Sequence, residues 1–361
     1  MKYIKQLDTL RAIAIIFVLM AHWLPKTNII QRVTKDSIGG FGVHIFFVLS
    51  GFLISSILLN TRNQAEEIGL KKAMAFKNFY ARRALRIFPI YYLLLLVLYI
   101  FRSNLDPYNS SFLYYFTYTT NFYIYNLKTW DVLLPQVWSL AVEEQFYLIW
   151  PWLILLINKK YLPQLIWCFI FIGIVSMWFF MDGRFGNILT FCCFDSFGLG
   201  ALLAWYAVEK SEHLIKLYRL LSIIVIPMLC VMVFDLYFPE WGYINFRTSG
   251  SIVSMWMIAY IYINRDTEKL NRNFLLNNRI LIFIGKISYG IYLYHSLMPT
   301  VINSHFLTTW LGPIVPNVVI NMAKHYFGPF MLLKNITCVL LISWLSYEII
   351  EKPFLKLKKY F

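Results

Sequence analysis

His22 and Glu143 are the two side chains on which acid–base chemistry could rest. Both lie inside long apolar runs, His22 in LDTLRAIAIIFVLMAHW and Glu143 in QVWSLAVEEQFYLIWPW. An ionisable side chain is costly inside a lipid bilayer, so each is a candidate for function. An imidazole can take the proton of a hydroxyl group, and a carboxylate can orient that imidazole. The two residues therefore predict general-base catalysis on a hydroxyl group, with Glu143 orienting His22 or binding the substrate.

A cluster of basic side chains predicts a site for phosphate groups. The segment RRALRIFPIYY places Arg82, Arg83 and Arg86 at the start of an apolar run, and Arg11 and Lys286 lie near the same expected end of their own runs. Arginine forks match the geometry of phosphate, so this ring of charge would suit a nucleotide-bearing donor. The alternative is that the cations only reflect the excess of Lys and Arg in cytoplasmic segments of membrane proteins.

Four further side chains are candidates for binding the substrate. Trp138 and Glu144 share the apolar run of the catalytic carboxylate, whereas Ser50 and His295 lie in two other runs. Ser50 could instead bond back to a carbonyl of its own helix. The aromatic segment 108–130 offers ring faces on which a sugar could stack.

The elements that position these residues are predicted to be membrane-spanning helices. Of the 361 residues, 59% are hydrophobic and only 14% are charged, and mean hydropathy is +0.60. The apolar runs are continuous rather than alternating, which favours helices over a barrel. The net charge of +15 is explained by basic cytoplasmic loops, so nucleic acid is not an expected partner. The five cysteines form no CxxC pair or Cys/His cluster, so neither a disulfide framework nor a metal site is expected.

Ten apolar runs are expected to cross the bilayer, in an all-α bundle. They are 7–25, 39–60, 85–102, 136–157, 161–181, 190–208, 219–236, 251–263, 280–300 and 329–350. The segment 112–125 would be an eleventh if it crossed, but we expect a partial or surface-lying helix. With both termini in the cytoplasm, the inner segments hold 22 Lys and Arg and the outer segments nine. This bias predicts that the basic ring lies inside, while His22 and Glu143 lie towards the outside.

The chain is expected to form a single membrane-embedded domain over 1–361. The first apolar run has no cleavable signal peptide before it and is expected to remain as an anchor. The chain stops soon after the last run, so no attached soluble domain is expected. Its oligomeric state is left open.

Six motifs, in order along the whole chain, resemble the acyltransferase-3 family of membrane O-acyltransferases. They are R-x10-H at Arg11/His22, GVxxFFVLSGFLI at 42–54, RRxxRIxPxYY at 82–92, WSLxxExxFYLxxP at 138–151, GKISYxIYLxH at 285–295 and YxxxEKPF at 347–354. One departure is His44, where the family often has an acidic or amide residue. We therefore assign no carboxylate role to that position.

The resemblance implies acyl transfer from acyl-CoA, most often acetyl-CoA, to a carbohydrate hydroxyl on the outer face. The acceptor would be a glycan such as O-antigen, exopolysaccharide or another cell-surface sugar, and the location a bacterial cytoplasmic membrane. The chain resembles the stand-alone members that lack a fused SGNH hydrolase-like domain. His22 could act as a base for direct transfer or carry the acyl group itself.

Two other functions compete with the enzyme. In a transporter or flippase, buried charges would mark a substrate pathway, and inverted repeats would favour it; the sequence contains none that we detect. In a membrane scaffold or lipid sensor, no function would require a histidine and carboxylates at the same depth in the membrane.

Overall fold

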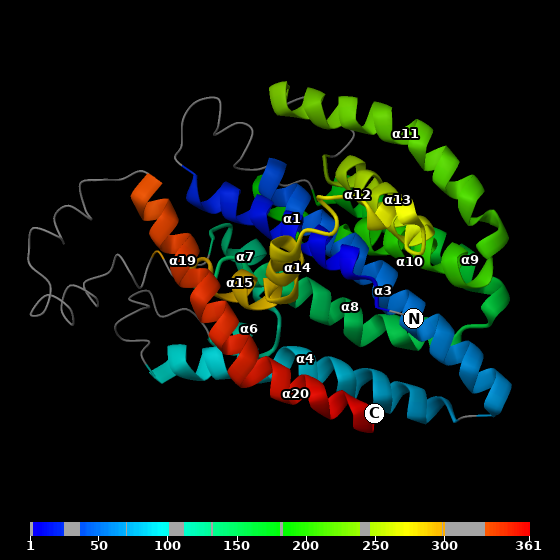
Figure 1. Ribbon diagram of the computed structural model, residues 1–361, viewed down its shortest axis with the longest axis horizontal. Helices are drawn as coiled ribbons and strands as arrows, with labels where there is room; N and C mark the ends of the chain where they lie inside the picture. The colour runs from blue at the N-terminus through cyan, green and yellow to red at the C-terminus, as the bar shows by residue number, and fades with distance from the viewer. Residues whose placement is uncertain are drawn as a thin grey trace, which may run out of the picture.

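The chain is an assembly of helices, shown in Figure 1. The computed structural model describes residues 3–24, 37–69, 71–100, 112–130, 133–180, 183–238, 246–297, 299 and 329–361, and these ranges contain no strand. The long helices are α1 (Lys5–Trp23), α3 (Gly39–Ile68), α4 (Lys72–Ile100), α8 (Val137–Leu156), α9 (Leu162–Phe179), α10 (Phe194–Glu209), α11 (Ser211–Tyr237), α12 (Phe246–Asn264) and α19 (Pro329–Ser346). The short ones are α6 (Phe112–Phe116), α7 (Thr120–Leu127), α13 (Glu268–Asn271), α14 (Arg279–Lys286), α15 (Ser288–Tyr294) and α20 (Lys352–Lys356).

Seven helices in the described ranges are long and apolar enough to cross a membrane. Helices α8 and α12 have the length of a span, 20 and 19 residues, but carry more polar side chains. Helix α11 lies along the edge of the assembly and exposes Leu220, Ile223 and Ile226, as a helix against lipid would. The described residues are therefore all-helical apart from turns and loops, as predicted, and these helices are compatible with a multi-pass membrane protein. The count of ten crossings and the cytoplasmic placement of both termini stay predictions.

The predicted run 280–300 is not one continuous helix. It divides into α14 and α15 at Ile287, whose backbone (φ −93°, ψ 7°) departs from the α-helical region. The hydroxyl of Ser288 donates to the carbonyl of Gly285 at 2.8 Å across this break. Residues 298 and 300 of the predicted run lie outside the described residues.

The aromatic segment 112–125 also forms two helices rather than one. Helices α6 and α7 have five and eight residues, and eight residues extend only about 12 Å at 1.5 Å per residue. Each is too short to cross a bilayer, which agrees with the expectation of partial helices. Residues 108–111 of the proposed sugar-stacking segment are outside the described ranges.

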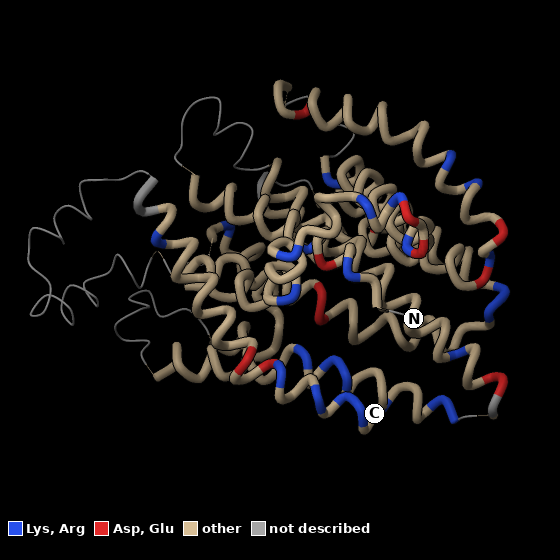
Figure 2. The backbone as a smooth tube through the Cα atoms, in the orientation of Figure 1, with Lys and Arg blue, Asp and Glu red and all other residues tan. Residues whose placement is uncertain are grey.

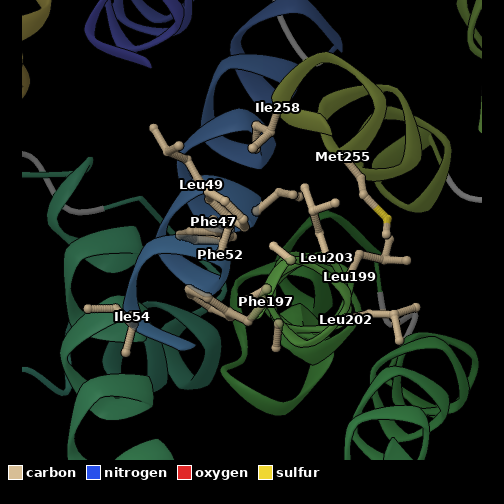
Figure 3. Packing of buried hydrophobic residues seen from close by; sticks show 14 of the residues in the cluster. Phe47, Leu49, Phe52, Ile54, Phe197, Leu199, Leu202, Leu203, Met255 and Ile258 are labelled. Carbon is tan, nitrogen blue, oxygen red and sulfur yellow. The ribbon is translucent and has the colours of Figure 1, made fainter. Parts of the chain in front are cut away.

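Helix α3 is the centre of the packing and contacts α1, α8, α10 and α12. Its crossing with α10 depends on glycine on both sides. A Cβ at Gly51 would lie 2.2 Å from the Phe197 carbonyl oxygen, and one at Gly200 would lie 2.1 Å from that of Val48. Phe47 then stacks on Phe197, with ring centroids 4.8 Å apart. Figure 3 labels both side chains within this packing. Gly51 and Gly200 therefore permit the close approach of α3 and α10.

Candidate functional site

A cavity of about 100 Å³ lies where five helices meet: α1, α3, α4, α8 and α15. Apolar atoms make up most of its surface, but ten polar or charged side chains from all five helices also line it: Arg11, Ser50, Arg83, Arg86, Ser139, Glu143, Tyr147, Ser288, Tyr289 and Tyr292. Because charged groups inside a membrane protein are costly, their collection in one cavity marks it as the candidate site.

Glu143 is held by two hydroxyl groups inside this cavity. Glu143 and Tyr147 are one turn apart on α8, so their side chains meet on one face of that helix. The hydroxyl of Ser50, on α3, donates to one Glu143 carboxylate oxygen at 3.1 Å. The Tyr147 hydroxyl lies 3.1 Å from the other oxygen and 3.0 Å from Ser50 Oγ, and its single hydrogen can serve either. These contacts fix the carboxylate in one orientation.

Three of the five predicted phosphate ligands line the cavity. Arg11 forms an ion pair with Asp8 on its own helix. The Arg83 guanidinium lies over the Tyr147 ring, 5.2 Å from its centroid, and Arg86 is the third. Arg82 and Lys286 are exposed and do not line the cavity. The structure thus brings part of the predicted basic ring to the cavity and leaves two members outside it.

His22 is exposed at the end of α1, where its ring contacts that of His295. The two ring centroids are 4.8 Å apart with an interplanar angle of 72°. His22 Nδ1 lies 2.8 Å from the carbonyl oxygen of Val18, and His295 Nδ1 lies 2.8 Å from that of Tyr292. A carbonyl oxygen only accepts, so each Nδ1 carries the hydrogen. In the neutral rings Nε2 is then the basic atom.

The structure places the two predicted catalytic residues in different groups. No hydrogen bond joins His22 to Glu143 among the described residues: Glu143 bonds to Ser50 and Tyr147, whereas His22 contacts His295. Tyr292 connects the two groups. It lines the cavity, its hydroxyl lies 2.5 Å from Ser139 Oγ, and its carbonyl holds the buried ring of His295.

Trp138 and Glu144, two of the substrate-binding candidates, do not line the cavity. Trp138 packs edge-on against Phe47, with ring centroids 6.2 Å apart. Glu144 does not line the cavity, and its Oε1 is buried with no hydrogen-bond partner among the described residues. The roles assigned to Trp138 and Glu144 from sequence stay predictions.

Sequence reasoning missed several polar cavity residues, and Tyr147 and Tyr292 are two of them. The signal for Tyr147 was available, because it follows Glu143 by four residues and such pairs share a helix face. Tyr292 stands in the aromatic run GIYLYH, and such runs are also typical of the aromatic belt at a membrane interface, so its sequence context does not single it out. Its burial against Ser139 is a tertiary contact that the spacing within one helix does not encode.

A second polar group lies outside the cavity, between α10 and α12. Arg247 belongs to α12, is only 4% exposed and lies 3.4 Å from Asp195. Asp195 also accepts from the Thr248 hydroxyl at 2.7 Å. The Arg247 guanidinium donates to the Asn187 carbonyl at 3.1 Å. This group is an internally bonded ion pair that stabilises the packing of α10 against α12. The described residues contain no group of three His, Cys, Asp or Glu placed to hold a metal.

Known proteins similar to this chain are O-acetyltransferases by name. The sequence profile of the acyltransferase domain, acyltransferase-3, matches residues 4–347. The peptidoglycan O-acetyltransferase OatA of Listeria monocytogenes is 28% identical over 98% of this chain and 56% of its own length. A candidate O-acetyltransferase of Staphylococcus aureus strain COL is 28% identical over 99% of this chain and 58% of its own length.

A third relative is YrhL of Bacillus subtilis, a candidate peptidoglycan O-acetyltransferase. It is 28% identical over 98% of this chain and 55% of its own length. The chain therefore spans little more than half the length of these curated relatives. No solved structure matches the chain.

Proposed function

The chain belongs to the acyltransferase-3 family, and on this premise we propose that it is a membrane O-acetyltransferase acting on a cell-wall glycan. The donor is acetyl-CoA from the cytoplasm, and the acceptor is a sugar hydroxyl on the outer face. Two of the relatives above carry peptidoglycan in their names, which favours peptidoglycan over O-antigen or exopolysaccharide as the acceptor. The proposed location is a bacterial cytoplasmic membrane, with both termini inside. The family relationship favours the enzyme over a transporter or flippase.

The donor end of the site is the cationic part of the cavity. Arg83 and Arg86 line it from α4, and Arg11 lines it from α1. A guanidinium can donate two parallel hydrogen bonds to a phosphate, which makes these three side chains suitable ligands for the phosphates of CoA. The pantetheine arm then follows the apolar wall towards α15, where the thioester meets the histidine pair.

The acid–base step uses the free nitrogen of His22. Nε2 takes the proton of the sugar hydroxyl while the oxygen attacks the thioester carbonyl carbon. The tetrahedral intermediate collapses with loss of the CoA thiolate, and the imidazolium returns its proton to that sulfur. The ester and the free thiol are the products. Glu143, positioned by Ser50 and Tyr147, binds the incoming groups within the cavity.

The alternative course at the same nitrogen is an acetyl-imidazole on His22, which the sugar then attacks. It makes a distinct prediction: acid-quenched protein carries label from [14C]acetyl-CoA when no acceptor is present. Direct transfer gives unlabelled protein under the same conditions.

The observation that supports this function is the geometry of one cavity, which holds guanidinium groups together with a hydroxyl-bound carboxylate and connects through Tyr292 to a histidine pair. The test is release of CoA from labelled acetyl-CoA by purified protein supplied with peptidoglycan fragments. We expect His22→Ala to reduce turnover by at least 100-fold, the usual size of a general-base contribution. The matched control is His213→Ala, because His213 is exposed on α11. Equal turnover by the two variants would refute the role of His22.

A further inference from the structure

The end of the chain lies against the helix that carries the donor arginines. Helix α20 and the turn Leu357–Tyr360 both pack on α4. Figure 1 shows the C-terminal segment beside α4, and Figure 2 shows that Lys and Arg gather along both. Two segments far apart in sequence therefore build one basic surface beside the cavity.

Lys358 belongs to the C-terminal turn that packs on α4. It is half-buried, and the charged side chains that act on it most strongly are Arg86, Arg83 and Arg82. All of them are positive. None of the ion pairs formed by the described residues includes Lys358 or any of these three arginines.

The acidic residues of the same segment offset only part of this positive charge. Glu348 is 2.5 Å from Lys352, with which it forms an ion pair. Glu351 is buried, its Oε1 has no hydrogen-bond partner among the described residues, and Arg86 is the charged side chain that acts on it. One carboxylate does not balance Lys358 and three arginines. Like charges at close range repel, and partial burial increases that repulsion. A bound anion would relieve it.

We propose that Lys358 joins Arg83 and Arg86 in a site for phosphate groups, and that the acyl-CoA donor supplies them. This inference rests on the proposed function and adds a ligand from the end of the chain to its donor site. Arg83 and Arg86 also line the cavity, so phosphates bound here place the rest of the donor at the cavity entrance. Lysine contributes a compact positive charge, whereas the arginines contribute planar forks.

An anionic lipid headgroup offers the same phosphate chemistry. Basic groups at a membrane surface attract such lipids, and the attraction falls as salt rises. The acyl-CoA donor is dissolved in water, whereas the lipid headgroup belongs to the bilayer. The experiment therefore varies the CoA ligand and the lipid composition separately.

The experiment measures CoA binding to the full chain by calorimetry, in nanodiscs of phosphatidylcholine alone and with added phosphatidylglycerol. Lys358→Ala is compared with Lys359→Ala, its exposed neighbour in the same turn. We expect Lys358→Ala to weaken CoA binding about tenfold, the size of one charge-assisted hydrogen bond, and Lys359→Ala to weaken it less than twofold. With acetyl-pantetheine, which has no phosphate, turnover by Lys358→Ala should equal that of the wild type.

Dephospho-CoA identifies the phosphate. If Lys358→Ala lowers the affinity for CoA tenfold but leaves the affinity for dephospho-CoA unchanged, Lys358 binds the 3′-phosphate. If it lowers both affinities, Lys358 binds the diphosphate. Either result supports the site. Wild-type CoA affinity in Lys358→Ala overturns the inference. A loss of CoA affinity that appears only in nanodiscs with phosphatidylglycerol also overturns the inference, because the ligand of Lys358 would then be a lipid. A wild-type protein that binds no CoA at all would instead refute the proposed function.

Discussion

Replacing Tyr147 by phenylalanine tests whether the hydroxyl network of the cavity serves catalysis. The change removes one oxygen, which lies 3.1 Å from the Glu143 carboxylate and 3.0 Å from Ser50. It keeps the aromatic ring under the Arg83 guanidinium. A hydrogen bond to a charged group contributes about 1.5–3 kcal/mol, and each 1.4 kcal/mol is a factor of ten. Since Ser50 keeps its own bond to Glu143, we expect the lower end of this range, about a tenfold loss.

The loss should appear in kcat rather than in KM for acetyl-CoA, because the guanidinium groups remain in place. The assay is steady-state CoA release by purified protein, with thermal unfolding measured on the same samples. Tyr80→Phe is the matched control: its hydroxyl donates one bond, to the Leu148 carbonyl at 2.8 Å, and it does not line the cavity. If Tyr147→Phe keeps the kcat of the control, the network does not position Glu143 for the reaction, and the reasoning from these contacts is wrong.

Three further changes have defined outcomes. His295→Phe removes the ring nitrogens beside His22. We expect kcat to fall about fivefold, the effect of one neutral hydrogen bond, while KM for acetyl-CoA stays the same. An unchanged kcat would contradict this prediction. Asp195→Ala leaves a buried guanidinium without its carboxylate and should lower the free energy of unfolding by about 3–5 kcal/mol, measured by thermal unfolding. The exposed Arg272–Glu268 pair is the control, and its loss should cost about 1 kcal/mol or less. Gly200→Ala should destabilise by about 1–3 kcal/mol because its Cβ meets the Val48 carbonyl, and a variant as stable as the wild type would refute the close crossing.

The sequence predicts the helices better than it predicts their contacts. The predicted runs 136–157 and 161–181 match α8 and α9 within a few residues, because hydropathy alone marks an apolar helix in lipid. The break at Ile287 was missed, since a change of backbone angle inside an apolar run leaves the hydropathy unchanged. Hydropathy also gives no sign that Arg247 is buried, because the ion pair with Asp195 that neutralises it is a tertiary contact.

The site was predicted by depth, and depth fixes only one coordinate of a side chain. His22 and Glu143 can lie at similar depths and still face different neighbours, because the rotation of each helix decides which side chains meet. The spacing within α8 determines that Glu143 meets Tyr147, whereas only tertiary packing determines that Ser50 meets them both. The same holds for the basic ring: Arg83 and Arg86 are three residues apart on one helix face, but Lys358 reaches them only because the end of the chain folds back on α4.

The arrangement separates the two tasks of the proposed reaction. The cations that would hold the donor lie on α1, α4 and the C-terminal turn, and the imidazoles that would activate the acceptor lie at the ends of α1 and α15. Tyr292 belongs to both regions, because its side chain lines the cavity and its carbonyl fixes His295. A rigid connection of this kind keeps the imidazole in place while the donor enters from the other end. Loss of Lys358 should therefore weaken binding of the donor, whereas loss of His295 should slow transfer, and the two effects should multiply in the double variant.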